Sequence, residues 1–169
     1  MTRAFFLDRD GVINADKAYV HKISDFEFVD GIFDACRAAQ SRGFIIIVAT
    51  NQSGIARGYY SEEDFAKLTA HMLGEFEKRG VRIADVFHCP LLDGPDRKPN
   101  PGMFLKARDR HRIDMARSVS LGDRERDIEA ASRAGVVRNY LLSESAGKTA
   151  AYAVVKSPKE MEALGAFDF

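Results

Sequence analysis

The stretch Phe5-Phe6-Leu7-Asp8-Arg9-Asp10-Gly11-Val12-Ile13-Asn14 joins a short apolar run to two carboxylates that are separated by one residue. The run predicts a buried strand that ends before Asp8, and the carboxyl ends of strands are where open α/β sheets place their ligands. In a regular strand Asp8 and Asp10 would face opposite sides of the sheet. Gly11 helps the chain to leave the strand, so both carboxylates can share one site.

The overall composition is typical of a soluble globular protein. The 169 residues suffice for one domain with a full core, 46% of them are apolar and 30% are charged. Twenty-five basic residues balance twenty-five acidic ones, so no net basic field would attract nucleic acid or an acidic membrane surface. We therefore expect a single domain over residues 1–169, a monomer, and neither a nucleic-acid nor a membrane partner.

The cysteine content and the N-terminal sequence indicate the compartment. The two cysteines, Cys36 and Cys89, make no disulfide framework and suit a reducing environment. Charged residues from Arg3 onward leave no apolar segment long enough for a signal peptide. The longest apolar run, Phe44 to Ala49, is too short to cross a bilayer. These features predict a cytoplasmic protein.

Short β-branched or aromatic runs alternate with helical periods, which favours an α/β fold with a Rossmann-like parallel sheet and helices on both faces. The expected strands are Arg3–Leu7, Phe44–Ala49, Ile83–His88, Ser118–Leu121, Val136–Leu142 and Tyr152–Val155. The expected helices are residues 31–40, a helix opened by Ser61, residues 101–112, residues 126–134 and a last one from Pro158. Ser61 and Asp64 have the spacing of a capping box, with Phe65, Leu68, Met72 and Phe76 as the buried stripe. Asn100 is the expected N-cap of the third helix.

Polar groups that phosphate chemistry requires follow four of these strands. They are Asp8 with Asp10, Thr50 with Asn51, Lys98, and Asp123 with Asp127. Because a parallel sheet brings its carboxyl ends to one edge, we expect these groups to meet. The carboxylates suit Mg²⁺, and the hydroxyl and the lysine suit a phosphate. One aspartate could attack phosphorus while a second moves protons.

The motifs Asp8-Arg9-Asp10-Gly11, Thr50-Asn51, Lys98-Pro99 and Gly122-Asp123-x-x-x-Asp127 resemble, in order and spacing, the four motifs of the haloacid dehalogenase superfamily of phosphohydrolases. Further segments resemble its heptose-bisphosphate phosphatases and the related histidinol-phosphate phosphatases. These segments include Tyr19-Val20-His21, Phe26-Glu27-Phe28, Thr50–Gly58 and Arg97–Met103. The resemblance implies a haloacid dehalogenase-like fold and a Mg²⁺-dependent phosphatase. The implied reaction removes the 7-phosphate of D-glycero-D-manno-heptose 1,7-bisphosphate through an aspartyl-phosphate intermediate.

The resemblance also implies roles for individual residues. Asp8 would be the nucleophile and Asp10 the general acid and base, while Thr50 and Lys98 would hold the transferring phosphoryl group. Mg²⁺ would be held by Asp8, the backbone carbonyl of Asp10, and Asp123, with Asp127 supporting these ligands from behind. Asn51 would also help to fix Asp10. The expected substrate contacts are Asp16, Tyr19, Asn51, Gln52, Ser53, Arg97 and Arg124.

Two features depart from the common pattern of these relatives. Many carry a zinc-binding loop before the lysine, but here the segment from Cys89 to Lys98 is short and has no further cysteine or histidine. A structural zinc site needs about four ligands, which His88 and Cys89 alone cannot supply, so we predict no zinc. Arg124 stands where many relatives have lysine, and it keeps the positive charge. Residues 12–50 leave no room for a large cap domain, which predicts an open site.

Three alternatives to a sugar-bisphosphate phosphatase are open at this point. The first is a phosphatase of histidinol phosphate or of another small sugar phosphate. The amine of histidinol phosphate calls for an acidic pocket, whereas Arg97 and Arg124 favour a bisphosphate. A phospho-accepting signalling module would not place a second acid two residues after the acceptor. An inactive sugar-phosphate-binding protein would not need every motif residue.

Overall fold

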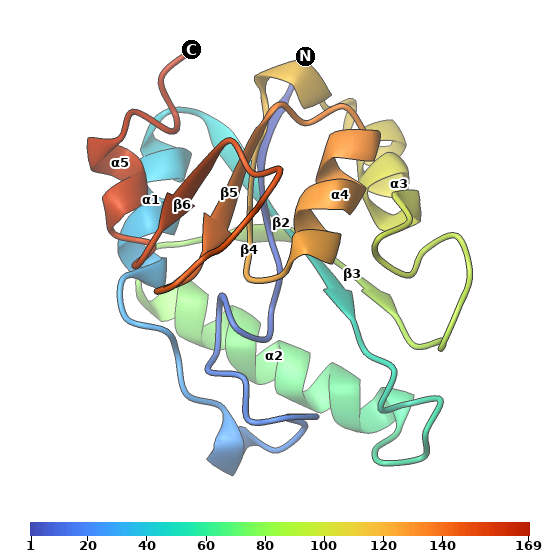
Figure 1. Ribbon diagram of the computed structural model, residues 1–169. Helices are drawn as coiled ribbons and strands as arrows, with labels where there is room; N and C mark the ends of the chain where they lie inside the picture. Colours follow the sequence, from blue (N-terminus) through green and yellow to red (C-terminus); the bar gives the residue numbers. More distant parts are fainter.

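A six-stranded parallel sheet forms the centre of the molecule, which a computed structural model describes over all residues, 1–169 (Figure 1). Its strands are β1 (Arg3–Leu7), β2 (Phe44–Asn51), β3 (Ile83–Cys89), β4 (Val119–Gly122), β5 (Arg138–Leu142) and β6 (Ala153–Val155). They lie in the order β3-β2-β1-β4-β5-β6, and every neighbouring pair is parallel. The Rossmann-like sheet expected from the sequence is confirmed, with β1 between β2 and β4.

Helices cover both faces of this sheet. They are α1 (Ile32–Ser41), α2 (Glu62–Lys78), α3 (Gly102–His111), α4 (Glu125–Arg133) and α5 (Glu160–Ala163), with short 3₁₀ turns η1 (Ile23–Asp25) and η2 (Met115–Arg117). Buried side chains of α1, α2 and α5 form one apolar cluster, and those of α3 and α4 form another. Figure 1 shows α1 and α5 on one side of the sheet and α3 and α4 on the other.

Alternation along β1 joins the two clusters. Phe5 and Leu7 belong to the cluster under α1 and α2, whereas Phe6 belongs to the one under α3 and α4. This is the period of a strand that is buried on both faces, as in α/β proteins. Burial of β1 on both sides fixes the direction in which the chain leaves the sheet at Asp8.

The start of α2 follows the sequence prediction. Ser61 accepts a hydrogen bond from the backbone N–H of Asp64 at 3.0 Å, and Asp64 Oδ2 accepts one from the backbone N–H of Ser61 at 2.9 Å. The capping box is therefore confirmed. The stripe expected to face the core is buried, and it consists of Phe65, Leu68, Met72 and Phe76.

Most boundaries differ from the expectation by one or two residues, and two of the differences lie near the polar groups that follow the strands. Strand β2 runs through Thr50 and Asn51, which pair with His88 and Cys89 of β3, although both were expected to follow the strand. Pro101, not Asn100, is the N-cap of α3, and the Asn100 amide donates to the carbonyl of Gly94 at 2.9 Å. The first difference places Thr50 in the regular sheet, which sets the direction of its side chain.

No large cap domain interrupts the sheet. Only η1 and α1 lie between β1 and β2, and only α2 lies between β2 and β3. None of the helices combines the length and the apolar character needed to cross a bilayer. Because no further domain is inserted between these strands, loops border the carboxyl edge of the sheet.

Candidate active site

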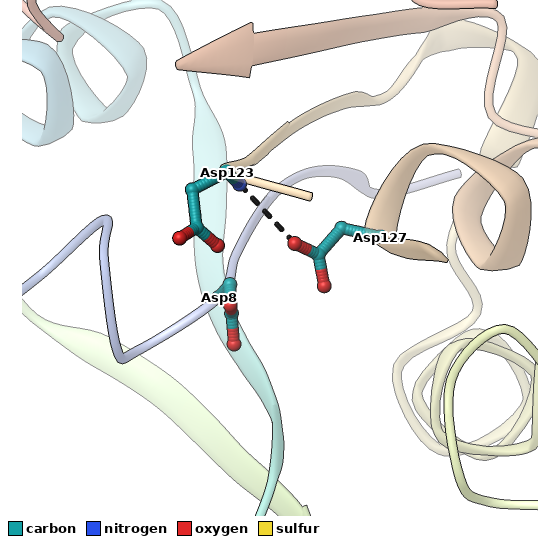
Figure 2. Close-up of side chains that lie close together, drawn as sticks. All are labelled: Asp8, Asp123 and Asp127. Atoms are coloured by element: carbon teal, nitrogen blue, oxygen red, sulfur yellow. Dashed lines mark hydrogen bonds between the residues drawn. The ribbon is translucent and has the colours of Figure 1, made fainter. Parts of the chain in front are cut away.

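Neighbouring strands bring three carboxylates together at the carboxyl edge of the sheet. Leu7 of β1 pairs with Leu121 of β4, so Asp8 and Asp123 leave the sheet side by side. Asp127 lies in the first turn of α4. Oxygen atoms of these three aspartates lie within 4.8 Å of one another, and Figure 2 shows their arrangement. The expected convergence of the first and fourth motifs is thus present in the structure.

Two glycines make this close approach possible. Gly11 has a φ of +89°, and a Cβ there would lie 2.1 Å from Asp123 Oδ2. A Cβ on Gly122 would lie 2.3 Å from the Cβ of Asp127. Any larger residue at either position would displace a carboxylate, so these glycines are part of the site.

Lys98 connects the carboxylates to the third motif. It is buried, and its Nζ lies 3.0 Å from Asp8 Oδ1, 2.7 Å from Asp127 Oδ1 and 2.8 Å from the carbonyl of Ala49. The side chain of Asn51 holds the backbone of Lys98 from both sides, accepting from its N–H at 3.0 Å and donating to its carbonyl at 3.2 Å. Asn51 therefore positions Lys98.

Burial is the largest influence on the ionisation of this cluster. It raises the pKa of Asp8 to about 6, with a further rise from the charge of Asp127 that Lys98 partly offsets. Burial, followed by the charges of Asp8 and Asp127, raises the pKa of Asp123 to about 8. Burial also opposes the charged form of Asp127, yet the ammonium of Lys98 outweighs it and lowers the pKa of that carboxyl. Asp127 and Lys98 thus form a charged pair beside two carboxylates that lack a full counter-charge.

The cluster fits a small divalent cation. Asp123 Oδ1 is buried and has no hydrogen-bond partner. The oxygens of Asp127 are already engaged, since Oδ2 accepts from the backbone N–H groups of Asp123 and Arg124 and Oδ1 faces Lys98. Asp8 and Asp123 are therefore the carboxylates that remain available, and Mg²⁺ binds by a few carboxylate oxygens of this kind. Asp127 thus binds Lys98 and two backbone N–H groups, and its support of the metal ligands stays a prediction.

Asp10 lies next to this cluster and is held by three side chains. Its Oδ1 accepts hydrogen bonds from Arg9 Nη2 at 2.9 Å and from Asn14 Nδ2 at 3.0 Å. Its Oδ2 accepts one from Gln52 Nε2 at 3.0 Å. The contact to Asp10 that was expected from Asn51 thus comes from Gln52, because the Asn51 amide is committed to Lys98.

A cavity of about 380 Å³ opens beside Asp10. All seven residues expected to contact substrate line it, namely Asp16, Tyr19, Asn51, Gln52, Ser53, Arg97 and Arg124. A smaller hollow of about 40 Å³ reaches Asp8 and Lys98, and it shares five residues with the cavity, namely Asp10, Asp16, Asn51, Arg124 and Arg126. Thr50 is 1% exposed and receives a hydrogen bond from Gln52 at 3.0 Å.

Three residues that line the cavity were not predicted from the sequence. Arg57 and Arg126 bring the number of lining guanidinium groups to four, with Arg97 and Arg124, and Tyr60 forms part of the wall. Arg57 stands in the quoted segment Thr50–Gly58, and Arg126 stands between Asp123 and Asp127. Their positions within these motif segments could have indicated that both arginines lie at the site. Among the carboxylates, Asp16 pairs with Arg124 at 3.3 Å, so positive charge predominates away from Asp10.

Comparisons with known proteins give the family. A model described as HAD-hydrolase-like matches residues 96–160. A D-glycero-alpha-D-manno-heptose-1,7-bisphosphate 7-phosphatase of Campylobacter jejuni is 48% identical over 161 residues, which are 95% of this chain and 94% of the relative. The chain belongs to this family of HAD-like phosphatases.

Another member, a D-glycero-beta-D-manno-heptose-1,7-bisphosphate 7-phosphatase of Vibrio cholerae, is also 48% identical, over 82% of this chain and 80% of the relative. The crystal structure of a D,D-heptose 1,7-bisphosphate phosphatase from B. bronchiseptica, complexed with magnesium and phosphate, superimposes with a TM-score of 0.87. That structure is 27% identical and covers 96% of this chain and 98% of its own. Membership of the family confirms the expected fold and phosphatase activity.

Proposed function

We propose that this phosphatase removes the 7-phosphate of D-glycero-D-manno-heptose 1,7-bisphosphate with the help of Mg²⁺ and through an aspartyl-phosphate intermediate. The observation that carries the proposal is the buried cluster of Asp8, Lys98 and Asp123 beside a cavity with four guanidinium groups. The cluster suits transfer of one phosphoryl group, and the guanidinium groups suit a second phosphate.

Asp8 is the proposed nucleophile. Its Oδ1 accepts hydrogen bonds from the backbone N–H of Arg9 at 2.8 Å and from Lys98 Nζ at 3.0 Å, which leaves Oδ2 to attack phosphorus. Thr50 and Lys98 donate to the oxygens of the phosphoryl group in this scheme. Mg²⁺, held by Asp8, Asp123 and the backbone carbonyl of Asp10, would neutralise charge on those oxygens.

Asp10 is the proposed general acid and base. As the bond between phosphorus and the sugar oxygen breaks, Asp10 gives its proton to that oxygen. It then takes a proton from the water that attacks the phosphorus of the aspartyl phosphate, which restores Asp8. Asp10 lines both the small hollow and the larger cavity, which suits both steps.

The guanidinium groups are the proposed site of the second phosphate. Arg57, Arg97, Arg124 and Arg126 line the cavity, and arginine can bind a phosphate through two parallel hydrogen bonds. Histidinol phosphate has an amine in place of a second phosphate. Asp16 is the acid that could receive this amine, but it is paired with Arg124. The charge of the cavity therefore favours the bisphosphate over histidinol phosphate.

We further propose a monomer in the cytoplasm that uses no zinc. The balanced charge and the two free, buried cysteines are in keeping with this proposal. Cys89 directs its Sγ toward the carbonyl of Leu91, and His88 bonds to Glu62.

Initial rates of phosphate release test the proposed function. The substrates are the α and β anomers of the heptose bisphosphate and histidinol phosphate, each with Mg²⁺ and with a chelator. We expect faster turnover of a bisphosphate anomer than of histidinol phosphate, and loss of both activities with the chelator. Faster turnover of histidinol phosphate, or full activity with the chelator, would contradict the proposal.

A further inference from the structure

Gln52 is a buried polar residue whose contacts the mechanism above does not use. It directly follows β2, and only 2% of its surface is exposed. Its Nε2 donates to Asp10 Oδ2 and to Thr50 Oγ1, both at 3.0 Å. One amide group therefore joins the residue that moves protons to a residue that holds the phosphoryl group.

Tyr60 fixes the direction of this amide. Its hydroxyl donates to Gln52 Oε1, so Nε2 is the end that faces the two acceptors. Tyr60 is itself held in place, since its ring stacks on His21 with centroids 5.1 Å apart. The ring also packs against Gly54, where a Cβ would lie 2.2 Å from it. The hydrogen bonds therefore form a series in which Tyr60 donates to Gln52, and Gln52 donates to Asp10 and Thr50.

The bonds to Asp10 distinguish its two oxygens. Oδ1 accepts from both Arg9 and Asn14, and one of these donors is a cation. Oδ2 accepts only from Gln52, so it keeps a lone pair for a proton. Because Gln52 occupies one side of Oδ2, it also sets the direction in which that proton points.

The hydrogen bond from Gln52 to Thr50 determines where the Thr50 hydroxyl can donate. With Gln52 donating to Thr50 Oγ1, the hydroxyl proton of Thr50 is left for another acceptor. The hydroxyl makes only a long hydrogen bond to the carbonyl of Asn51, with 3.4 Å between the two oxygen atoms. It can therefore turn toward a phosphoryl oxygen.

We propose that Gln52, oriented by Tyr60, is a positioning residue that makes Asp10 Oδ2 the proton-carrying oxygen and frees the Thr50 hydroxyl for the phosphoryl group. The inference rests on the proposed function. In the first step the proton leaves Oδ2 for the sugar oxygen as its bond to phosphorus breaks. In the second step Oδ2 recovers a proton from water, as the water oxygen bonds to phosphorus and the bond from phosphorus to Asp8 breaks.

The test compares two leaving groups, with kcat/KM measured in Mg²⁺ for heptose 1,7-bisphosphate and for p-nitrophenyl phosphate. The sugar oxygen needs a proton as it leaves, whereas nitrophenolate leaves readily without one. In Gln52→Leu we expect kcat/KM to fall about 100-fold for the sugar and at most about tenfold for p-nitrophenyl phosphate. The loss for the sugar should lie in kcat, with KM almost unchanged.

Tyr60→Phe gives the same test with less risk to folding, because it removes a single oxygen atom. We expect a loss in the same direction of about three- to tenfold for the sugar, since the amide of Gln52 is then free to turn. Gln52→Glu keeps the size of the side chain and an acceptor for Tyr60, but it loses both donors, so it should not restore activity. Tyr152→Phe is the matched control, because that tyrosine is 60% exposed and contacts Tyr140.

Two results would overturn the inference. Equal losses for the two leaving groups would show that Gln52 does not act on the proton of Asp10, and a change confined to KM would make Gln52 a substrate contact. A wild-type protein that releases phosphate from neither compound would overturn the proposed function and this inference with it.

Discussion

Asp123 and Asp8 show, at the scale of single residues, how burial prepares a site for a cation. The raised pKa values, about 8 and about 6, mean that the folded protein binds protons more tightly than the unfolded chain does. Without metal, the free energy of unfolding should therefore decrease as the pH rises from about 4 to about 8. Mg²⁺ replaces those protons, so it should stabilise the protein more at the upper end of this range.

Thermal unfolding at about pH 5 and about pH 8, with and without Mg²⁺, measures this effect. We expect the increase in Tm on addition of Mg²⁺ to be larger at the higher pH. In Asp123→Asn the repulsion among the carboxylates is smaller, so the metal-free variant should be at least as stable as the wild type at about pH 8. It should also lose most of the increase caused by Mg²⁺. If Mg²⁺ raises the Tm of this variant as much as that of the wild type, Asp123 is not a metal ligand.

Residue-level prediction from the sequence worked where backbone topology alone decides position. Asp8 and Asp123 follow strands that end in apolar residues, so their meeting could be expected. Gln52 was expected to contact substrate and lines the cavity, but its hydrogen bonds to Asp10 and Tyr60 were not foreseen. The turn between Gln52 and Tyr60, which includes Gly54, sets the direction of the amide, and no periodicity in the sequence encodes it.

At the scale of elements, the first turn of α4 combines two tasks. Asp127 faces inward to Lys98, while Arg124 and Arg126 face the cavity. The spacing of the motif predicted the first task. Arg126 was not predicted, since an arginine in a first turn is usually a solvated residue and only the packed helix shows which way it faces.

The variant Arg126→Ala tests the second task. If Arg126 binds the second phosphate, KM for the heptose bisphosphate should rise about tenfold or more, because a charge-assisted hydrogen bond is lost. KM for p-nitrophenyl phosphate, which has no second phosphate, should stay nearly constant. Arg133→Ala is the matched control on the same helix, as Arg133 pairs with Glu129. Equal increases in KM for both substrates would exclude a site for the second phosphate at Arg126.

A substitution at the N-terminus of α2 tests a contribution to stability without changing any proposed catalytic residue. Ser61→Ala removes the capping-box hydrogen bond to the backbone of Asp64, which should lower the free energy of unfolding by about 1 kcal/mol. Urea unfolding measures the change, with the exposed Ser145→Ala as the control. A change equal to that of the control would show that the cap contributes nothing.

The end of strand β2 is a feature of an element that the sequence did not predict. Its apolar run ends at Ala49, so the strand was expected to end there, but pairing with β3 continues through Asn51. Polar residues can extend a strand where its end faces a site, and hydrophobic pattern alone does not reveal this. The extension matters because it holds Thr50 and Asn51 in fixed directions.

At the scale of the whole molecule, the strand order explains why distant motifs form one site. With β1 between β2 and β4, the residues that follow these strands lie next to one another at one edge of the sheet. The alternation of strands and helices predicted this parallel sheet, and the short interval of residues 12–50 predicted that no large cap domain covers its edge. The size of the cavity and its four guanidinium groups depend on loop conformation, which the sequence did not define.

The central claim is that Asp8 attacks the phosphorus of a sugar bisphosphate at this edge. Phosphate release from heptose 1,7-bisphosphate by the wild type and by Asp8→Asn, in Mg²⁺, tests it most directly, with thermal unfolding to verify that both are folded. Because asparagine is nearly isosteric with aspartate but lacks the nucleophilic carboxylate, we expect release by the variant to fall to the background of the assay while the wild type turns over. Release by Asp8→Asn at the wild-type rate would contradict the account.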